Sequence, residues 1–461
     1  MPAAHPFPRF PRRPCRLWRE ARTRVPRHLK PRRTSVHGTE EQHNRRQRMN
    51  RLMNLPLACR IRSLGRMLGR WMAALMLCLG VSAAAVAGPL QDPATDAFYA
   101  PPSPLPEGPH GTLIRSRPYV PLGLPAWGWQ IMYKSTDVNG NPIAVTGNVM
   151  VPWLPWFQSS PRPIIGWASG TQGVADRCAP SHQLAIGTEY EAIAGPIGWT
   201  LARGWAIAMT DYQGLGTPGD HPYGVAAPTG RAMLDAVIAA QQLGGANLSV
   251  QAPVGLVGYS QGGHASAVAA ELQPSYAPAL KVKGVASGAG PSSVDGLYAA
   301  HNGGLFGGAI PYLMVGLNAA YPELNLDGIL TAYGKSVMAE ARNNKCLLAM
   351  AASYPGLSDA VMVDGPGILD RPDWKARFQQ QRTGTATPAA PALIYAGLLD
   401  EIVPYENTKK TFTAWCAGGA KVSFRTIGIT EHATGMLLGY PIALDWMADR
   451  FAGNPAPSNC P

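Results

Sequence analysis

The sequence lacks the features that mark a metal protein or a nucleic-acid binder. It has no Cys-x-x-Cys pair, no His-x-x-x-His pair and no internal repeat, so we expect no metal site and no cofactor. Its net charge of +12 would suit a nucleic-acid partner, but residues 1–87 hold 19 of the 40 Lys and Arg and 3 of the 28 Asp and Glu. These residues carry +16 and residues 88–461 carry −4. We therefore expect no nucleic-acid partner.

The sequence also lacks an apolar run long enough for an ordinary membrane span. Residues 1–59 are rich in Arg and Pro and predict a disordered leader, which suggests a start codon placed too early. Residues 60–87 predict a signal peptide, because four Arg precede the apolar run Trp71–Val81 and Ala85–Ala87 fits a cleavage site. The sequence thus predicts a protein secreted after cleavage near Ala87, in the periplasm or outside. An uncleaved membrane anchor is the alternative, for which the apolar run is short.

Cysteine is scarce in the remaining chain. Of seven Cys, three fall in residues 1–87 and four remain, namely Cys178, Cys346, Cys416 and Cys460. Four Cys in an exported chain suggest two disulfides, for which three connectivities exist.

Short apolar runs alternate with helical patterns along the body of the chain. Two alternating segments flank Asn139-Gly140, which predicts an antiparallel hairpin at a sheet edge, whereas residues 92–125 are expected to be irregular. The remaining strands are expected at 163–169, 205–210, 254–257, 282–289, 392–396 and 421–426, with helices at 190–202, 231–243, 265–270 and 441–451. The alternation predicts an α/β fold with a mostly parallel sheet flanked by helices.

About a hundred residues separate two consecutive strands of this pattern, too many for a loop. We expect a helical cap or lid over residues 291–390, inserted between core segments 88–290 and 391–461. Its glycine-rich stretch, residues 303–308, is either a lid hinge or a close-packing point.

The motif Gly258-Tyr259-Ser260-Gln261-Gly262 matches Gly-x-Ser-x-Gly. It follows an apolar run and precedes a helical pattern, the strand–turn–helix context of a nucleophile elbow. The tight turn needs its flanking glycines, because two chain segments approach closely there. Ser260 is therefore the candidate nucleophile, with a serine in an ordinary turn as the alternative.

The general base and acid follow by elimination, since this arrangement orders the triad Ser, acid, His. After Ser260 only three His remain: His264 is expected to face the helix packing, His301 lies in the cap, and His432 follows the last strand. His432 is the candidate base. Among seven intervening Asp, only Asp400 directly follows a core strand, which makes it the candidate acid, with Glu401 and Glu431 as rivals.

Two backbone N–H groups are expected to form the oxyanion hole. One belongs to Gln261, after the nucleophile, and the other is assigned to Gln172 in the loop after the strand 163–169. An ordinary tight turn is the alternative for residues 170–173.

Several motifs make the chain resemble the secretory lipases of the lipase A type, which are α/β-hydrolases with a helical cap. They are spread over residues 92–461: Asp96–Pro102, Cys178–Ser181, Gly258–His264, Asp400–Tyr405 and Glu431-His432.

The resemblance implies a catalytic triad of Ser260, Asp400 and His432 and disulfides Cys178–Cys346 and Cys416–Cys460. It also maps an oxyanion contribution near Gln172, where the fungal lipase has an acidic residue. We therefore expect a secreted serine hydrolase that cleaves acyl esters such as triacylglycerols. Its partner would be a small-molecule or lipid ester, with lipid-interface contact through the cap.

Three alternatives to this function remain, and the sequence leaves the oligomeric state open. An acyltransferase or a peptidase would use the same triad. A non-catalytic binding protein would reuse the fold alone.

Overall fold

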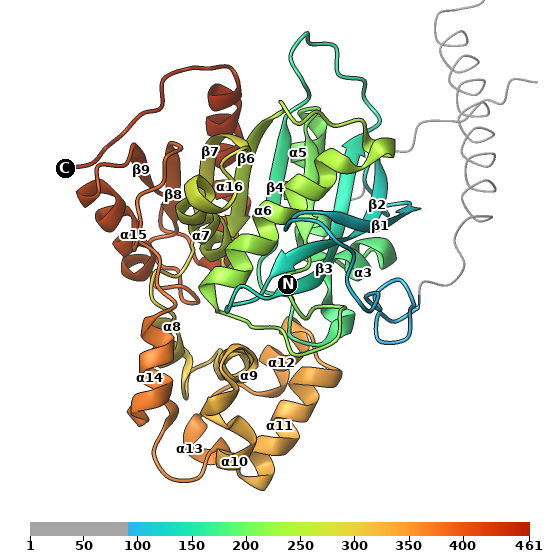
Figure 1. The fold of residues 1–461 in the computed structure, drawn as a ribbon. Helices are drawn as coiled ribbons and strands as arrows, with labels where there is room; N and C mark the ends of the chain where they lie inside the picture. Colours follow the sequence, from blue (N-terminus) through green and yellow to red (C-terminus); the bar gives the residue numbers. More distant parts are fainter. Residues whose placement is uncertain (1–90) are drawn as a thin grey trace, which may run out of the picture. The chain divides into compact units, whose positions relative to one another are not determined.

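The computed structural model describes residues 91–461 (Figure 1). The predicted leader (1–59) and signal peptide (60–87) lie outside the described residues. Within the described part of the chain, no helix combines the length and the apolar character needed to cross a membrane.

One nine-stranded sheet organises the chain. Its strand order is β1-β2-β3-β5-β4-β6-β7-β8-β9, with antiparallel pairing from β1 to β5 and parallel pairing from there to β9. The strands are β1 (Leu113–Tyr119), β2 (Ala126–Thr136), β3 (Pro142–Pro152), β4 (Ile164–Ala168), β5 (Ala206–Thr210), β6 (Pro253–Tyr259), β7 (Lys281–Gly288), β8 (Ala392–Ala396) and β9 (Val422–Thr426). The predicted mostly parallel sheet is confirmed.

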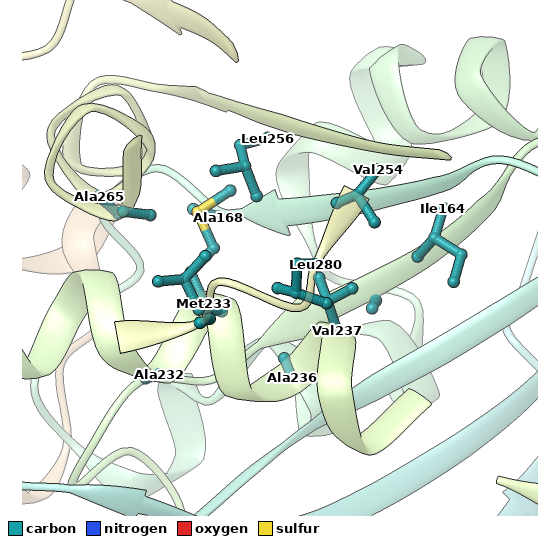
Figure 2. Packing of buried hydrophobic residues seen from close by; sticks show 14 of the residues in the cluster. Ile164, Ala168, Ala232, Met233, Ala236, Val237, Val254, Leu256, Ala265 and Leu280 are labelled. Carbon is teal, nitrogen blue, oxygen red and sulfur yellow. The ribbon is translucent and has the colours of Figure 1, made fainter. Parts of the chain in front are cut away.

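Alternation along the central strands builds a hydrophobic layer on each face of the sheet. Ile164 and Ala168 of β4 point into one cluster, whereas Ile165 and Trp167 point into the other. This is the period of two that a strand imposes on its side chains. Figure 2 shows part of the first layer, where Met233 and Val237 meet the strands.

Helices cover both faces, which is why the central strands are apolar throughout. The helices of the core are α3 (Pro180–Ile186), α4 (Tyr190–Ala194), α5 (Pro196–Ala202), α6 (Ala226–Gln242), α7 (Gln261–Tyr276), α15 (Tyr405–Ala417) and α16 (His432–Phe451). Residues of α6, α7 and α15 belong to one hydrophobic layer, and residues of α3, α5 and α16 belong to the other.

Two sequence expectations need correction. Residues 113–119 were expected to be irregular but form β1, which takes the sheet edge from the predicted hairpin. The strand pairs on one side only and contains Pro118, as is common at a sheet edge. The last helix was expected to begin at Pro441, but it begins nine residues earlier, at His432. Pro441 therefore lies inside α16 and does not mark its start.

Between β7 and β8 the chain forms a series of helices joined by turns (Figure 1, yellow to orange). The α-helices of this insertion, the cap (residues 291–390), are α8 (Val294–His301), α9 (Ile310–Ala320), α10 (Leu326–Ile329), α11 (Ala332–Asn343), α12 (Leu347–Ser353), α13 (Asp359–Met362) and α14 (Pro372–Gln379). They share a hydrophobic cluster that includes Met314, Trp374 and Phe378.

The glycines near the start of the cap are packing points at two positions. A Cβ on Gly307 would overlap the backbone of Leu357, and one on Gly308 would overlap the carbonyl of Met350. Two chain segments approach closely there, which favours packing over a hinge for this pair.

Candidate active site

Ser260 occupies a strained turn between β6 and α7. Its φ is 59° and its ψ is −119°, in the positive-φ range that residues other than glycine rarely adopt. The Ser260 N–H donates to the carbonyl of Gly288 (2.9 Å), and its carbonyl accepts from the N–H of His264 (3.0 Å). The backbone therefore holds the turn from both sides, as a nucleophile elbow requires.

The glycines of the motif are required because the neighbouring backbone leaves no room for a side chain. A Cβ on Gly258 would overlap the carbonyl of Gly262, and one on Gly262 would overlap the carbonyl of Ala168. A Cβ on Gly263 would overlap the carbonyl of Gly288. The first turn of α7 thus packs directly against the neighbouring backbone.

Asp400 and His432 form a hydrogen-bonded pair, in which the carboxylate is buried and the imidazole is partly exposed. Nδ1 of His432 lies 2.8 Å from both carboxylate oxygens of Asp400, whose side chain is fully buried. Asp400 also accepts N–H bonds from Ile402 (3.1 Å) and Val403 (2.7 Å). These bonds keep the carboxylate directed at Nδ1, which leaves Nε2 as the free end of the imidazole.

The two rival acids bind the backbone around His432 rather than its ring. Glu401 accepts from the N–H of His432 (3.0 Å). Glu431 is the N-cap of α16 and accepts from the N–H groups of Ala433 (2.6 Å) and Thr434 (2.7 Å). The hydroxyl of Tyr259 donates to the carbonyl of His432 (2.9 Å). The backbone of His432 is therefore held at its N–H by Glu401 and at its carbonyl by Tyr259.

Ser260, Gln261 and His432 line one cavity of about 280 Å³. Its walls are largely apolar, and the cap contributes many of them, including Leu297, Phe306 and Leu313. Apolar walls with a few polar groups are typical of pockets that bind small molecules. Among residues 91–461, no group of three or more His, Cys, Asp and Glu side chains is placed to hold a metal ion.

Gln261 is anchored through its side chain. Nδ1 of His221 donates to the carbonyl of Gln213 (2.7 Å), so Nε2 accepts from the Gln261 amide (3.0 Å). Burial lowers the pKa of His221 to about 4, which keeps the ring neutral. The N–H of Gln261 is the first of α7 and has no acceptor within its own helix. It is therefore free to serve an oxyanion.

Gln172 is not among the residues that line the cavity, whereas its neighbour Thr171 is. The side-chain amide of Gln172 donates to Glu189 (3.0 Å). The backbone carbonyl of Gln172 accepts from the N–H of Leu347 in the cap (2.8 Å). Only the backbone of Gln172 is thus left to contribute to the site.

Two buried carboxyls support this loop. Glu189 also accepts from the N–H of Ala192 (2.6 Å), and Glu191 accepts from Trp167 (3.0 Å) and Tyr440 (2.8 Å). Burial raises the pKa of both glutamates, and the proximity of Glu191 raises that of Glu189 further. Sequence reasoning missed this pair, because acidic residues in a predicted helix ordinarily face solvent.

Two further His lie on the cavity wall. His264 is buried, as expected of a residue that faces helix packing, but it also lines the cavity, which the sequence did not predict. His301 of the cap lines the same cavity. Burial lowers the pKa of His264 to about 4 and also lowers that of His301, so both rings are neutral at neutral pH. The signal for His264 was its spacing of one helical turn from Ser260.

The disulfides have the pairing that the family resemblance implies. Cys178 bonds to Cys346, and Cys416 bonds to Cys460. The first joins the segment after Gln172 to the residue before α12, so it links the core to the cap beside the site. The second joins the end of α15 to the C-terminal segment.

Comparison with known sequences identifies close relatives over most of the chain. The secretory lipase family model matches residues 179–459. Lipase 4 of Candida albicans is 30% identical over 397 residues, covering 80% of this chain and 83% of the relative. A protein of Mycobacterium tuberculosis named a probable inactive lipase is also 30% identical, over 79% of this chain and 83% of its own length.

Comparison with solved structures bears on the fold. Candida antarctica lipase A in its closed state matches with a TM-score of 0.73 and 27% identity, over 80% of this chain and 88% of that one. The rice cell wall degrading esterase LipA of Xanthomonas oryzae matches with a TM-score of 0.61 and 20% identity, over 75% of this chain and all of its own. The predicted α/β-hydrolase fold is confirmed.

Proposed function

Because the chain belongs to the secretory lipase family of ester hydrolases, we propose that it is a secreted serine hydrolase that cleaves acyl esters, including triacylglycerols. The observation that carries the proposal is the hydrogen bond between Asp400 and His432, together with the apolar cavity that His432 lines with the strained Ser260. A nucleophile, a base and an orienting acid are the three parts that acyl transfer needs.

The proposed reaction has two half-reactions. Ser260 Oγ attacks the ester carbonyl while Nε2 of His432 takes its proton, and Asp400 stabilises the imidazolium through Nδ1. The N–H groups of Gln261 and Gln172 bind the tetrahedral oxyanion. His432 then protonates the leaving alcohol, which leaves an acyl-enzyme. Water, activated by the same His432, releases the acid and restores Ser260. No metal or organic cofactor takes part in these steps.

The cavity wall supports an apolar acyl chain as substrate. Each buried CH₂ group contributes about 0.8 kcal/mol, so kcat/KM is expected to rise about fourfold per added CH₂ until the chain fills the cavity. Exposed Leu348 of the cap also lines the cavity, so its mouth has an apolar edge that suits a lipid surface.

The decisive measurement is the initial hydrolysis rate of p-nitrophenyl esters from acetyl to palmitoyl, with Ser260→Ala as control. Activity that needs Ser260 and persists or rises with long chains would support a lipase. Serine-dependent activity restricted to short chains would indicate an esterase with a shallow pocket. An ester hydrolase role would be rejected if no ester were cleaved in a Ser260-dependent manner.

One relative favours a second candidate, a non-catalytic binding protein, because it is named a probable inactive lipase. A fluorophosphonate probe separates the two, since it labels only an activated serine. Labelling of the wild type but not of Ser260→Ala supports an enzyme. An acyltransferase would also be labelled, and competition between water and an added alcohol for the acyl-enzyme identifies it.

We also propose export after cleavage near Ala87, supported by membership of a family named for secretion. N-terminal sequencing of the mature protein tests this point. A first residue close to position 88 is expected, and a chain that begins at or before Met49 would contradict it.

A further inference from the structure

The oxyanion loop (residues 169–173) follows β4 and contains Gln172, whose backbone N–H is one of the two proposed oxyanion donors. The side chain of Gln172 is bonded to Glu189 and its carbonyl to the cap, so the direction of its N–H depends on how the loop backbone is held. A donor must point at the oxygen on which negative charge develops, and a small displacement of the donor lowers the rate. The groups that hold this backbone therefore bear on catalysis.

Two tyrosine hydroxyls bond to the oxyanion loop, both to residues that precede Gln172. Tyr212 donates to the carbonyl of Ser169 (2.7 Å). The hydroxyl of Tyr223 pairs with the hydroxyl of Thr171 (2.7 Å), directly before Gln172. All four bonded residues are buried, where the loss of a hydrogen bond leaves its partner unsatisfied. The two bonds therefore hold the chain that leads from β4 to the donor.

The backbone at Tyr212 is strained. Its φ is 70°, a value that residues other than glycine rarely adopt, and the residue is only 1% exposed. The N–H of Tyr212 donates to the hydroxyl of Thr210 (2.9 Å), which helps to keep this conformation. Strained backbone persists where the surroundings enforce it, and it is concentrated at functional sites. Here the strained residue is one of the two that hold the oxyanion loop.

The other proposed oxyanion donor is held from the same segment of the chain. His221, two residues before Tyr223, accepts from the side-chain amide of Gln261 (3.0 Å) and donates to the carbonyl of Gln213 (2.7 Å). The rings of Tyr212 and His221 stack with 5.6 Å between centroids, and those of His221 and Tyr223 meet edge to face at 6.0 Å. One row of aromatic rings therefore reaches both donors.

The cap packs against the end of this row. A Cβ on Gly316 of α9 would overlap the backbone of Tyr223, and the ring of Tyr312 meets that of Tyr223 edge to face at 5.9 Å. Close packing of this kind leaves Tyr223 little freedom to move. Its hydroxyl therefore stays beside Thr171.

Resting on the function proposed above, we propose that the segment from Tyr212 to Tyr223 is the positioning element of the oxyanion hole. Tyr212 and Tyr223 hold the backbone that leads to Gln172, and His221 holds Gln261. These side chains act through the two donors and take no part in bond making. Losing one of them should lower the rate because the oxyanion is less well stabilised, while the triad stays in place.

The test measures kcat/KM for p-nitrophenyl butyrate and the infrared stretch of the acyl-enzyme carbonyl, isotope-labelled at that carbon. A hydrogen bond to the carbonyl oxygen lowers the stretching frequency, so this band reports on the oxyanion hole directly. For Tyr212→Phe and for Tyr223→Phe we expect kcat/KM to fall about tenfold and the band to move to higher frequency. The double variant should lose about 10²-fold, as when one donor is removed. His221→Phe should shift the same band through Gln261.

Further variants separate this role from a general loss of stability. Thr171→Val removes the partner of Tyr223 and should reproduce the effects of Tyr223→Phe, whereas Thr171→Ser keeps the hydroxyl and should restore most of kcat/KM. Tyr276→Phe is the matched control, because the hydroxyl of Tyr276 also pairs with a threonine, Thr136 (2.9 Å). Tyr276 ends α7, about 22 Å along the helix axis from Gln261, so its replacement should lower stability alone.

Two results would overturn the proposal while leaving the esterase function intact. One is an unchanged kcat/KM in both Tyr212→Phe and Tyr223→Phe. The other is a lower kcat/KM with the carbonyl band at its wild-type frequency, which would mean that the tyrosines only stabilise the fold. If no ester is hydrolysed in a Ser260-dependent manner, the proposed function fails and this proposal fails with it.

Discussion

Nδ1 of His432 lies 2.8 Å from each carboxylate oxygen of Asp400, although 32 residues separate them in the chain. The pair forms because β8 and β9 are parallel neighbours, so the segments that follow them start side by side at the carboxyl ends of the strands. Strand β6, which precedes Ser260, runs parallel to them and ends on the same side of the sheet. The proposed catalytic groups thus lie beyond the carboxyl ends of parallel strands, where α/β folds commonly bind ligands.

The hydrogen bond between Asp400 and His432 predicts how kcat changes when the negative charge of Asp400 is removed. Asp400→Asn can present an N–H to Nδ1 and favours the wrong tautomer, so kcat should fall by about 10⁴-fold. Glu401→Gln is the control, since Glu401 contacts only the backbone N–H of the same His, and its kcat should fall by about tenfold or less. Steady-state kinetics on a soluble ester measure both. Near-wild-type turnover of Asp400→Asn would reject Asp400 as the acid.

The two disulfides should differ in their effect on activity. On the loop-entropy model, loops of 168 and 44 residues correspond to at most about 5 and 4 kcal/mol of stability. Replacing Cys178 and Cys346 by Ala should also lower kcat/KM, because this bond links the loop of Gln172 to the cap. Replacing Cys416 and Cys460 should lower stability alone. Urea unfolding and ester hydrolysis of the two double variants give the comparison, and equal losses of kcat/KM at matched stability would contradict it.

The raised pKa of buried Glu189 predicts a pH-dependent stability. Below its ordinary pKa near 4.5 the group is protonated both folded and unfolded. As the pH rises, the unfolded chain ionises first, so the free energy of unfolding falls until the raised pKa is passed. Glu189→Gln cannot ionise, and it should therefore gain stability relative to the wild type between pH 5 and pH 8.

Glu431→Gln is the control for this pH effect. Hydrogen bonds at the start of α16 lower the pKa of Glu431, so that residue is ionised folded and unfolded from pH 5 to pH 8. Its stability difference from the wild type should stay constant over that range. Urea unfolding at both pH values decides the matter, and a constant difference for Glu189→Gln would refute the explanation.

Apolar side chains on the loops around the proposed triad predict a lipid-binding surface. Leu399, before Asp400, is 60% exposed and Ile429, before His432, is 77% exposed. The two loops are bonded, since the N–H of Leu399 donates to the carbonyl of Thr430 (3.1 Å). Leu399→Asn with Ile429→Asn should lower hydrolysis of emulsified long-chain triacylglycerol about tenfold and leave a soluble butyrate ester unaffected.

Phe157→Asn is the matched control for this surface. Phe157 is 84% exposed. It precedes β4, so it lies near the amino ends of the parallel strands, whereas Ser260 lies at their carboxyl ends. Its replacement should leave both rates unchanged. Equal losses on emulsion and soluble ester in the double variant would show that these side chains act on the active site and not at the lipid surface.

Local patterns were enough to predict much of the fold. Strands β4, β5, β6 and β8 are mostly apolar because both faces of the sheet are covered there. The Gly-x-Ser-x-Gly turn has the strain and the close glycine contacts that its spacing implies. The edge strand β1 could not be predicted, because its alternation is weak and its pairing comes from β2 alone.

The sequence by itself determined the order of the strands from β2 to β9, the elbow at Ser260 and the candidate residues Asp400 and His432. These features depend on side-chain periodicity and local turn chemistry, which involve residues close together in the sequence. Only the tertiary structure decided which side chains share the cavity. It turned the Gln172 side chain toward Glu189, and it placed His264 on the cavity wall. Such contacts join residues distant in sequence, and they depend on how helices and loops pack rather than on any local pattern.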